Sequence, residues 1–345
     1  MKTYDLRLEI GNHCNLRCPL CLRQSPVLDK NVLNRVHLSL NDVKKFLPRF
    51  FLTNQIKSVL ISGSSSEPTM NSNLINIVKY LIKYNSNIIV DSNGSTRNID
   101  WWAELGATGV QCDFAPDSIK PNNNKYRINS NTDKVIENMQ AFISAGGTAR
   151  WKFIPYAHNQ DELEEQRTIS KSIGATFFVA QPFTVRNRTE KVEDSDLFPK
   201  DHKLVRYTEN STPHHYCKIL GEIQNLLEIS AEGIVYPCTF SSRQLYYVYG
   251  DYFVSGNTTP KVNFEYVKGW TENLDSFIES FVPLIEDQGG IETLSLHHYS
   301  ITEILNSPFY KNTLKQSWSN KEHFCNKHCN HVKYSDHLDY VLNKN

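Results

Sequence analysis

The chain has 345 residues, 39% of them hydrophobic, and its 37 Lys and Arg residues balance 37 Asp and Glu residues. Zero net charge provides no long-range attraction to nucleic acid or to an anionic membrane, so we expect neither as a main partner. The N-terminal segment has no apolar signal core and no uncharged stretch could span a bilayer, so we expect a cytoplasmic protein whose 8 cysteines are metal ligands or buried thiols.

Short apolar runs alternate with amphipathic segments through the first half of the chain. They predict strands at about 4–10, 57–62, 87–92, 108–113, 149–154 and 175–180. Helices are predicted between them at about 39–51, 73–84, 97–105, 131–145 and 159–172. Asn131 or Thr132 can cap the fourth helix, and Asn159 the fifth. Right-handed crossovers would make this an α/β fold, a partial (β/α)6 TIM-like barrel whose strands all end on one face.

The alternation stops after Phe183, where a charged and polar stretch begins. We therefore predict a barrel domain over 1–185, a connecting segment over 186–216 and a smaller α+β module over 217–345. In the module we expect a hairpin around Glu232-Gly233 and helices near 271–285 and 301–318. The Tyr-rich segment from Leu245 to Phe253 favours an alternating strand over the lining of a substrate cavity.

Three cysteines, Cys14, Cys18 and Cys21, form a C-x3-C-x2-C run directly after the first predicted strand. A cubic iron–sulfur cluster normally needs four thiolates, one per iron, so three thiolates would leave one iron with an open coordination position. The alternative is a structural zinc site. Such sites usually show two CxxC pairs, or one CxxC with a matched pair of histidines, and neither follows here.

The cysteine spacing, its position after the first strand and the six βα units together resemble the radical S-adenosylmethionine (SAM) superfamily. The resemblance implies that Cys14, Cys18 and Cys21 hold a 4Fe–4S cluster and that SAM chelates the open iron. An electron from the cluster would cleave SAM, and the resulting 5′-deoxyadenosyl radical would remove a hydrogen atom from a substrate. An electron donor such as flavodoxin or ferredoxin is implied as a partner.

The same resemblance implies contacts to SAM from five further residues. Glu67 matches a glutamate that receives the SAM amino group, although serines precede it where glycines are usual. Ser92 and Asn93 match a polar turn facing SAM, and Arg127 an arginine that pairs with its carboxylate. Leu20 stands where an aromatic residue usually packs on adenine. The alternatives are ordinary βα turns and a surface arginine.

Four downstream cysteines, in the pattern C…G-x4-C followed by C-x3-C, resemble the SPASM and twitch extensions that bind auxiliary iron–sulfur clusters. The resemblance implies one auxiliary 4Fe–4S cluster on Cys217, Cys238, Cys325 and Cys329. Zinc is the alternative, because His323, His328 and His331 surround the last two cysteines. Cys112, inside a predicted strand, is expected to be a buried thiol.

We therefore expect a radical SAM enzyme that oxidises (dehydrogenates) or otherwise tailors a small molecule such as a sugar or aminocyclitol. An alternative is a maturase that crosslinks, epimerises or oxidises a ribosomal peptide. A third hypothesis is a non-catalytic zinc or iron–sulfur binding or sensor protein. The sequence identifies no catalytic base, and Asp113, Asp117 and Asp251 are candidates without further support.

Overall fold

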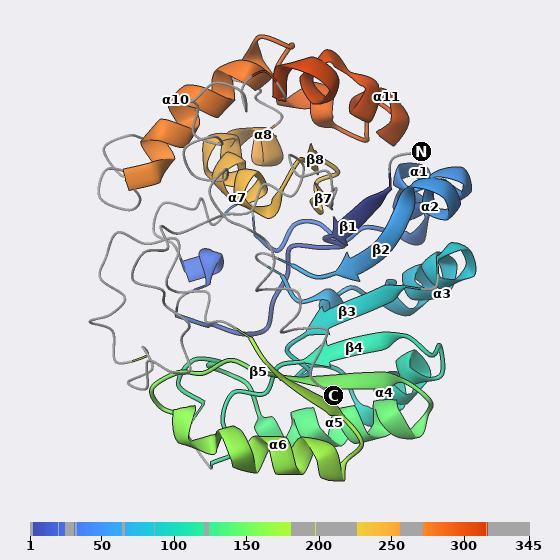
Figure 1. Ribbon diagram of the computed structural model, residues 1–345, viewed down its shortest axis with the longest axis vertical. Coiled ribbons are helices and arrows are strands. Elements are labelled where there is room, and N and C mark those ends of the chain that lie inside the picture. Colours follow the sequence, from blue (N-terminus) through green and yellow to red (C-terminus); the bar gives the residue numbers. More distant parts are fainter. Residues whose placement is uncertain are drawn as a thin grey trace.

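A computed structural model describes residues 3–19, 21–24, 31, 33–63, 66–85, 87–120, 124–180, 197, 226–255, 272–314 and 316. Their strands form one eight-stranded sheet in the order β6-β5-β4-β3-β2-β1-β7-β8, parallel except for the antiparallel pair β7 and β8 (Figure 1). The strands are β1 (Tyr4–Leu8), β2 (Ile56–Ile61), β3 (Ile88–Ser92), β4 (Gln111–Phe114), β5 (Thr148–Phe153), β6 (Thr176–Val179), β7 (Leu226–Ile229) and β8 (Val235–Tyr236). The six strands and the parallel sheet predicted for the first half of the chain are confirmed.

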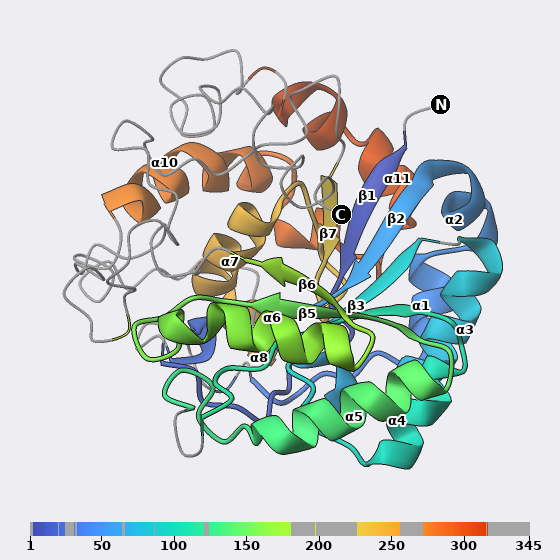
Figure 2. The same cartoon turned by 60° about the horizontal axis from the view of Figure 1, so that its bottom comes forward.

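Helices α1 to α6 follow the outer side of the fan of strands (Figures 1 and 2). They are α1 (Leu40–Phe46), α2 (Arg49–Gln55), α3 (Leu74–Tyr84), α4 (Ile99–Gly106), α5 (Thr132–Ser144) and α6 (Leu163–Ser172), with 3-10 turns η1 (Leu22–Gln24), η3 (Pro68–Met70) and η4 (Gln160–Glu162). The ring of Trp102 on α4 lies 4.8 Å from that of Phe114 on β4, and Phe114 lies 5.5 Å from Phe142 on α5. These fully buried rings fasten the helices to the sheet and form much of its outer core.

The opposite face of the sheet, called here the inner face, is polar. Along β3, β4 and β5 the residues buried under the helices alternate with Asp91, Asp113, Arg150 and Lys152. Successive side chains of a strand point to opposite faces, so these four charges share the inner face. The carboxyl ends of the parallel strands open onto the same edge of the sheet, where α/β folds bind their ligands.

The predicted hairpin around Glu232-Gly233 is confirmed as β7 and β8, and β7 pairs in parallel with β1, so the hairpin continues the sheet. Helix α7 (Thr239–Val248) covers its inner face, where the Ser242 hydroxyl donates to the buried carboxylate of Glu228 at 2.6 Å. Tyr249 donates to Glu286 of α10 (Glu272–Glu286) at 2.6 Å. The remaining elements are α8 (Gly250–Ser255), η7 (Ile291–Leu294), α11 (Ile301–Asn306) and the π-helical turn η8 (Phe309–Thr313).

The alternating strand predicted from the Tyr-rich segment is wrong, because that segment lies in α7 and α8. Leu245, Val248 and Tyr249 are at most 1% exposed and are spaced three and four residues apart, which places them on one helical face. The run of aromatic residues concealed this helical spacing, because the sequence between the buried positions is also aromatic and not polar.

Three smaller predictions also changed. The helix expected over 39–51 is two helices, because Pro48 keeps the preceding Leu47 out of helical geometry (φ −124°, ψ 74°) and begins α2. Asn131 caps α5 as expected, whereas Asn159 accepts a bond from the Tyr156 backbone instead of capping a helix. The helix predicted from 301 ends at Asn306, just before a Ser-Pro pair.

The predicted connecting segment, 186–216, lies outside the described residues except for Leu197, whose carbonyl accepts a bond from the Ala157 backbone at 3.0 Å. The bounds of the three predicted segments therefore stay predictions. In the part of the chain that the structure describes, no helix combines the length and hydropathy that a bilayer crossing requires.

Candidate active site

The three N-terminal cysteines lie on the loop that follows β1, and all three are half-buried free thiols. The Cys14 sulfur accepts a bond from the Leu16 backbone at 3.4 Å, and the Cys21 backbone donates to the Cys18 carbonyl at 3.0 Å, which makes the second half of the loop a tight turn. Burial raises the pKa of Cys14 to about 12 and that of Cys18 to about 11. Thiols in this state must lose protons to bind iron.

Neighbouring segments hold this loop in place. The Asn12 side chain accepts bonds from the backbone of Arg35 at 2.8 Å and of Val36 at 3.0 Å. The Arg23 guanidinium donates to the Asn12 carbonyl at 2.8 Å. Arg23 also donates to the Asn34 side chain at 2.8 Å, so residues on either side of the three cysteines are both bonded to the segment 34–36.

Glu67, on the loop after β2, is buried and joins three loops. Its carboxylate accepts bonds from the Thr69 backbone and hydroxyl, from the Ser92 hydroxyl at 2.7 Å and from the Asn93 backbone at 2.7 Å. Its own backbone donates to the His13 carbonyl at 2.7 Å, next to Cys14. Burial raises the pKa of Glu67, and the hydrogen bonds oppose that shift. Three of the bonds reach Oε1 and one reaches Oε2, so Oε2 has capacity for a further donor such as an ammonium group.

The turn after β3 also contacts the cysteine loop. Asn93 donates to the Asn15 side chain at 2.9 Å, and Asn15 donates to the Ser95 hydroxyl at 2.8 Å. Gly94 adopts φ +73°, and a Cβ atom there would meet Val135 at 2.8 Å. The turn therefore requires glycine, both for its backbone conformation and for the close approach of α5.

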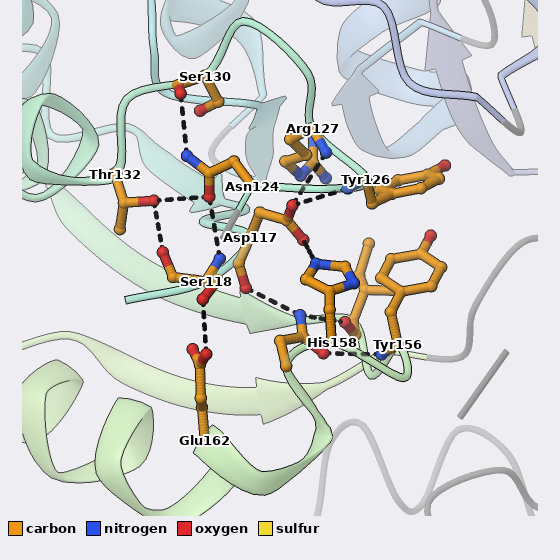
Figure 3. Close-up of polar contacts among 12 residues, drawn as sticks. Asp117, Ser118, Asn124, Tyr126, Arg127, Ser130, Thr132, Tyr156, His158 and Glu162 are labelled. Atoms are coloured by element: carbon orange, nitrogen blue, oxygen red, sulfur yellow. Dashed lines mark hydrogen bonds and ion pairs between the residues drawn. The ribbon is translucent and has the colours of Figure 1, made fainter. Parts of the chain in front are cut away.

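Arg127 lies on the loop between β4 and α5, where the buried Asp117 carboxylate holds its backbone. The Asp117 carboxylate accepts bonds from the backbones of Tyr126 and Arg127, each at 3.0 Å, and lies 3.0 Å from Nε2 of His158 (Figure 3). Both side chains of this pair are at most 2% exposed. Burial lowers the pKa of the Arg127 guanidinium, but the thiol of Cys18 and other acidic groups raise it by more, so its pKa lies above the ordinary value. Arg127 is thus a cation beside the cysteine loop.

Aromatic rings extend this network. Figure 3 shows the rings of Tyr126 and Tyr156 side by side, with centroids 4.1 Å apart, and the His158 ring lies 5.8 Å from Tyr156. The Arg17 backbone donates to the Ile128 carbonyl at 3.1 Å, so the loop that carries Arg127 is also bonded to the cysteine loop. Sequence reasoning missed the pairing of Asp117 with His158, because the two residues lie on separate loops without any periodic pattern.

The remaining predicted site residues are placed only in part. Leu20, Cys217, Cys325 and Cys329 lie outside the described residues. Cys238 is half-buried at the start of α7, where its sulfur accepts a bond from the Ser241 backbone at 3.4 Å. Cys112 is fully buried, as expected. Of the three candidate bases, Asp113 is paired with Arg150 and Asp117 with His158, while the Asp251 side chain is outside the description.

The cysteine loop offers the types of ligand that iron–sulfur clusters require. Three soft thiolate ligands on one loop, partly shielded from water and next to the half-buried Arg127 cation, suit iron–sulfur ligation. Within the described ranges, no three or more His, Cys, Asp and Glu side chains form a group that could hold a metal ion. The residue types of the cysteine loop thus fit the cluster, but its three thiols are not drawn together as a metal-binding group among the described residues, so ligation by them is a proposal.

Residues 8–170 match the family model of the radical SAM superfamily, so the chain contains a radical SAM superfamily domain. The GTP 3′,8-cyclase of Peptoclostridium acidaminophilum is 22% identical over 248 residues, which are 68% of this chain and 73% of that protein. The superfamily implies a 4Fe–4S cluster and SAM as cofactors.

Two solved structures share the fold. Hexahistidine-tagged anSMEcpe with bound AdoMet is 13% identical, with a TM-score of 0.54, over 94% of this chain and 86% of that one. Streptococcus suis SuiB bound to its precursor peptide SuiA is 15% identical, with a TM-score of 0.52, over 85% of this chain and 69% of that one. At these identities the comparison establishes the α/β architecture alone.

Proposed function

We propose that this chain reductively cleaves SAM and uses the resulting radical to remove a hydrogen atom from a small molecule, such as a sugar or aminocyclitol, for its oxidation or tailoring. One observation carries the proposal: three loops far apart in sequence each bond to the cysteine loop. Glu67 reaches His13, Asn93 reaches Asn15, and Ile128 reaches Arg17. Four of the five residues expected around SAM, Glu67, Ser92, Asn93 and Arg127, therefore lie on or next to loops that meet the cysteine loop, while Leu20 lies outside the described residues.

The proposal gives each of these residues a role. Cys14, Cys18 and Cys21 would hold the cluster, and Arg127 would pair with the SAM carboxylate, for which a guanidinium has the matching fork of donors. The free capacity of Glu67 Oε2 suits the SAM amino group. When bound, the cluster and SAM supply the electron and the 5′-deoxyadenosyl radical that removes the hydrogen atom.

A second candidate is a peptide substrate. It is favoured by the likeness to SuiB, which was solved with a precursor peptide, whereas the relative named GTP 3′,8-cyclase favours a small molecule. Both are relatives at low identity. The two charged pairs on the inner face of the sheet support the small-molecule proposal, because small-molecule sites use a few placed polar or charged groups to orient the ligand.

We also propose that Cys217, Cys238, Cys325 and Cys329 hold one auxiliary 4Fe–4S cluster, which would accept the second electron of an oxidation. The hairpin before Cys238 supports this proposal, as does the end of the described chain, where Tyr310 donates to the Val235 carbonyl at 2.9 Å and so brings η8 to that hairpin. Zinc bound to the module instead would remove the electron acceptor. Iron and zinc analysis of the loaded protein decides between them, with about eight irons per chain expected for two clusters.

Anaerobic reconstitution followed by dithionite and SAM tests the main proposal. We expect 5′-deoxyadenosine from the wild type and none from Cys18→Ala, because that variant lacks one of the three cluster ligands. Cys112→Ala is the matched control, since it removes a buried thiol outside the loop and should retain SAM cleavage. Iron loading without SAM cleavage in the wild type would favour the non-catalytic binding protein.

A further inference from the structure

Two ion pairs lie on the inner face of the sheet, close to the carboxyl ends of three neighbouring strands. Asp91 on β3 is level with Asp113 on β4, and Asp113 is level with Arg150 on β5, where Lys152 is two residues further along. All four residues alternate with positions buried under the outer helices. The proposed cofactor contacts use none of them.

One pair is held by two hydrogen bonds, although its Arg150 side chain keeps 21% of its surface exposed. Arg150 donates to both oxygens of Asp113, at 2.7 and 2.6 Å, in the two-bond geometry that guanidinium and carboxylate favour. The Phe178 ring covers the guanidinium at 4.7 Å, and the Asp113 side chain is only 7% exposed. This pair is therefore a rigid part of the inner face, because both of its side chains are held in place.

The other pair is open. The Lys152 ammonium donates to Oδ1 of Asp91, crossing over β4, and the two side chains keep 15% and 30% of their surface exposed. Within the described part of the chain, neither side chain makes another hydrogen bond or ion pair. Two N–H groups of Lys152 and one oxygen of Asp91 therefore stay available to a ligand.

The open pair lies close to the candidate active site. Asp91 precedes Asn93 by two residues, about 7 Å along a strand, and Asn93 bonds to Asn15 beside Cys14. A small molecule seated on Lys152 and Asp91 would thus reach toward the edge of the sheet where the three loops meet. A compact substrate bound at Asp91 would have to span this distance of about 7 Å to reach the edge of the sheet.

We propose that Lys152 and Asp91 bind neighbouring hydroxyl groups of a neutral, polyhydroxylated substrate, an inference that rests on the proposed radical SAM function. Each hydroxyl group can accept a bond from the ammonium and donate one to the carboxylate. The two acids and two bases of these pairs cancel, so the pairs themselves supply no net charge to attract a phosphate-rich substrate.

Saturation-transfer NMR on the reconstituted protein with SAM tests this site. The probes are myo-inositol and D-glucose as polyols and inorganic triphosphate as an anion. We expect at least one polyol to bind the wild type and triphosphate not to displace it. Asp91→Asn and Lys152→Gln should each weaken polyol binding about tenfold, the usual effect of losing a hydrogen bond to a charged group.

Lys79→Gln is the matched control, because Lys79 forms a similar pair with Glu104 at 3.1 Å on the outer surface and should bind polyol like the wild type. Iron content and the thermal unfolding midpoint show whether each variant is loaded and folded, and if one is not, the other variant decides. The inference is overturned if neither polyol binds the wild type, if a folded variant binds as tightly, or if triphosphate displaces the polyol. The proposed function fails separately, if the wild type forms no 5′-deoxyadenosine.

Discussion

Asp117→Asn tests whether the buried pair with His158 positions Arg127. The substitution keeps the shape of the side chain but removes a charge that accepts two backbone bonds at 3.0 Å and faces His158 at 3.0 Å. A hydrogen bond to a charged group contributes about 1.5–3 kcal/mol, and a buried polar group left without a partner costs about 1–3 kcal/mol. An amide keeps one acceptor oxygen, so we expect a loss of about 2–4 kcal/mol in the free energy of unfolding.

Because the two backbone bonds hold the segment that carries Arg127, SAM affinity should also fall, by about tenfold for one lost bond to its carboxylate. Urea unfolding measures the first effect and calorimetric titration with SAM the second. Glu104→Gln, which breaks an exposed ion pair on α4, is the control and should change stability by about 1 kcal/mol or less. An Asp117→Asn protein as stable as the wild type, with unchanged SAM affinity, would refute this account of the loop.

Three further predictions concern other parts of the structure. Gly94→Ala should cost about 1–3 kcal/mol of stability, measured by urea unfolding, because the turn needs a positive φ and the added methyl group would meet Val135 at 2.8 Å; an unchanged midpoint would contradict the strain. Burial raises the pKa of Glu232, so the folded state holds this proton more tightly than the unfolded state, and Glu232 loses stability as pH rises from the unfolded pKa, about 4.3, through its folded pKa. Glu232→Gln should therefore gain stability relative to the wild type as the pH rises above the unfolded pKa of about 4.3 in urea unfolding, and a stability difference independent of pH would argue against it. Cys238→Ala should halve the iron content of the loaded protein while sparing SAM cleavage; full iron content would remove Cys238 from the auxiliary site.

The parts of the fold that the sequence predicted are those with a local hydrophobic period. Strands such as β2 and β3 and the amphipathic helix α3 repeat buried residues at intervals of two, three and four, which periodicity alone detects. Periodicity did not detect helix α7, because its Tyr-rich sequence does not alternate apolar and polar residues at helical intervals. Pro48 divided one predicted helix into two through a steric effect that the hydrophobic pattern does not contain.

Some residues of the candidate site could likewise be predicted from the sequence, and others could not. The cysteine loop and Glu67 could be chosen from short motifs, and the structure brings them together. The pair Asp117 and His158 could not, because 41 residues separate them and neither belongs to a motif. The inner-face pair Lys152 and Asp91 is 61 residues apart and depends on strand order, which only the assembled sheet provides. The auxiliary cluster remains a prediction, since three of its four cysteines lie outside the described residues.

The central claim is that the loop carrying Cys14, Cys18 and Cys21 supports reductive cleavage of SAM. Its most direct test is the amount of 5′-deoxyadenosine formed per chain by the iron-loaded protein with dithionite under anaerobic conditions. The account predicts formation by the wild type and none by Cys18→Ala. Undiminished formation by Cys18→Ala, or none by a fully iron-loaded wild type, would contradict it.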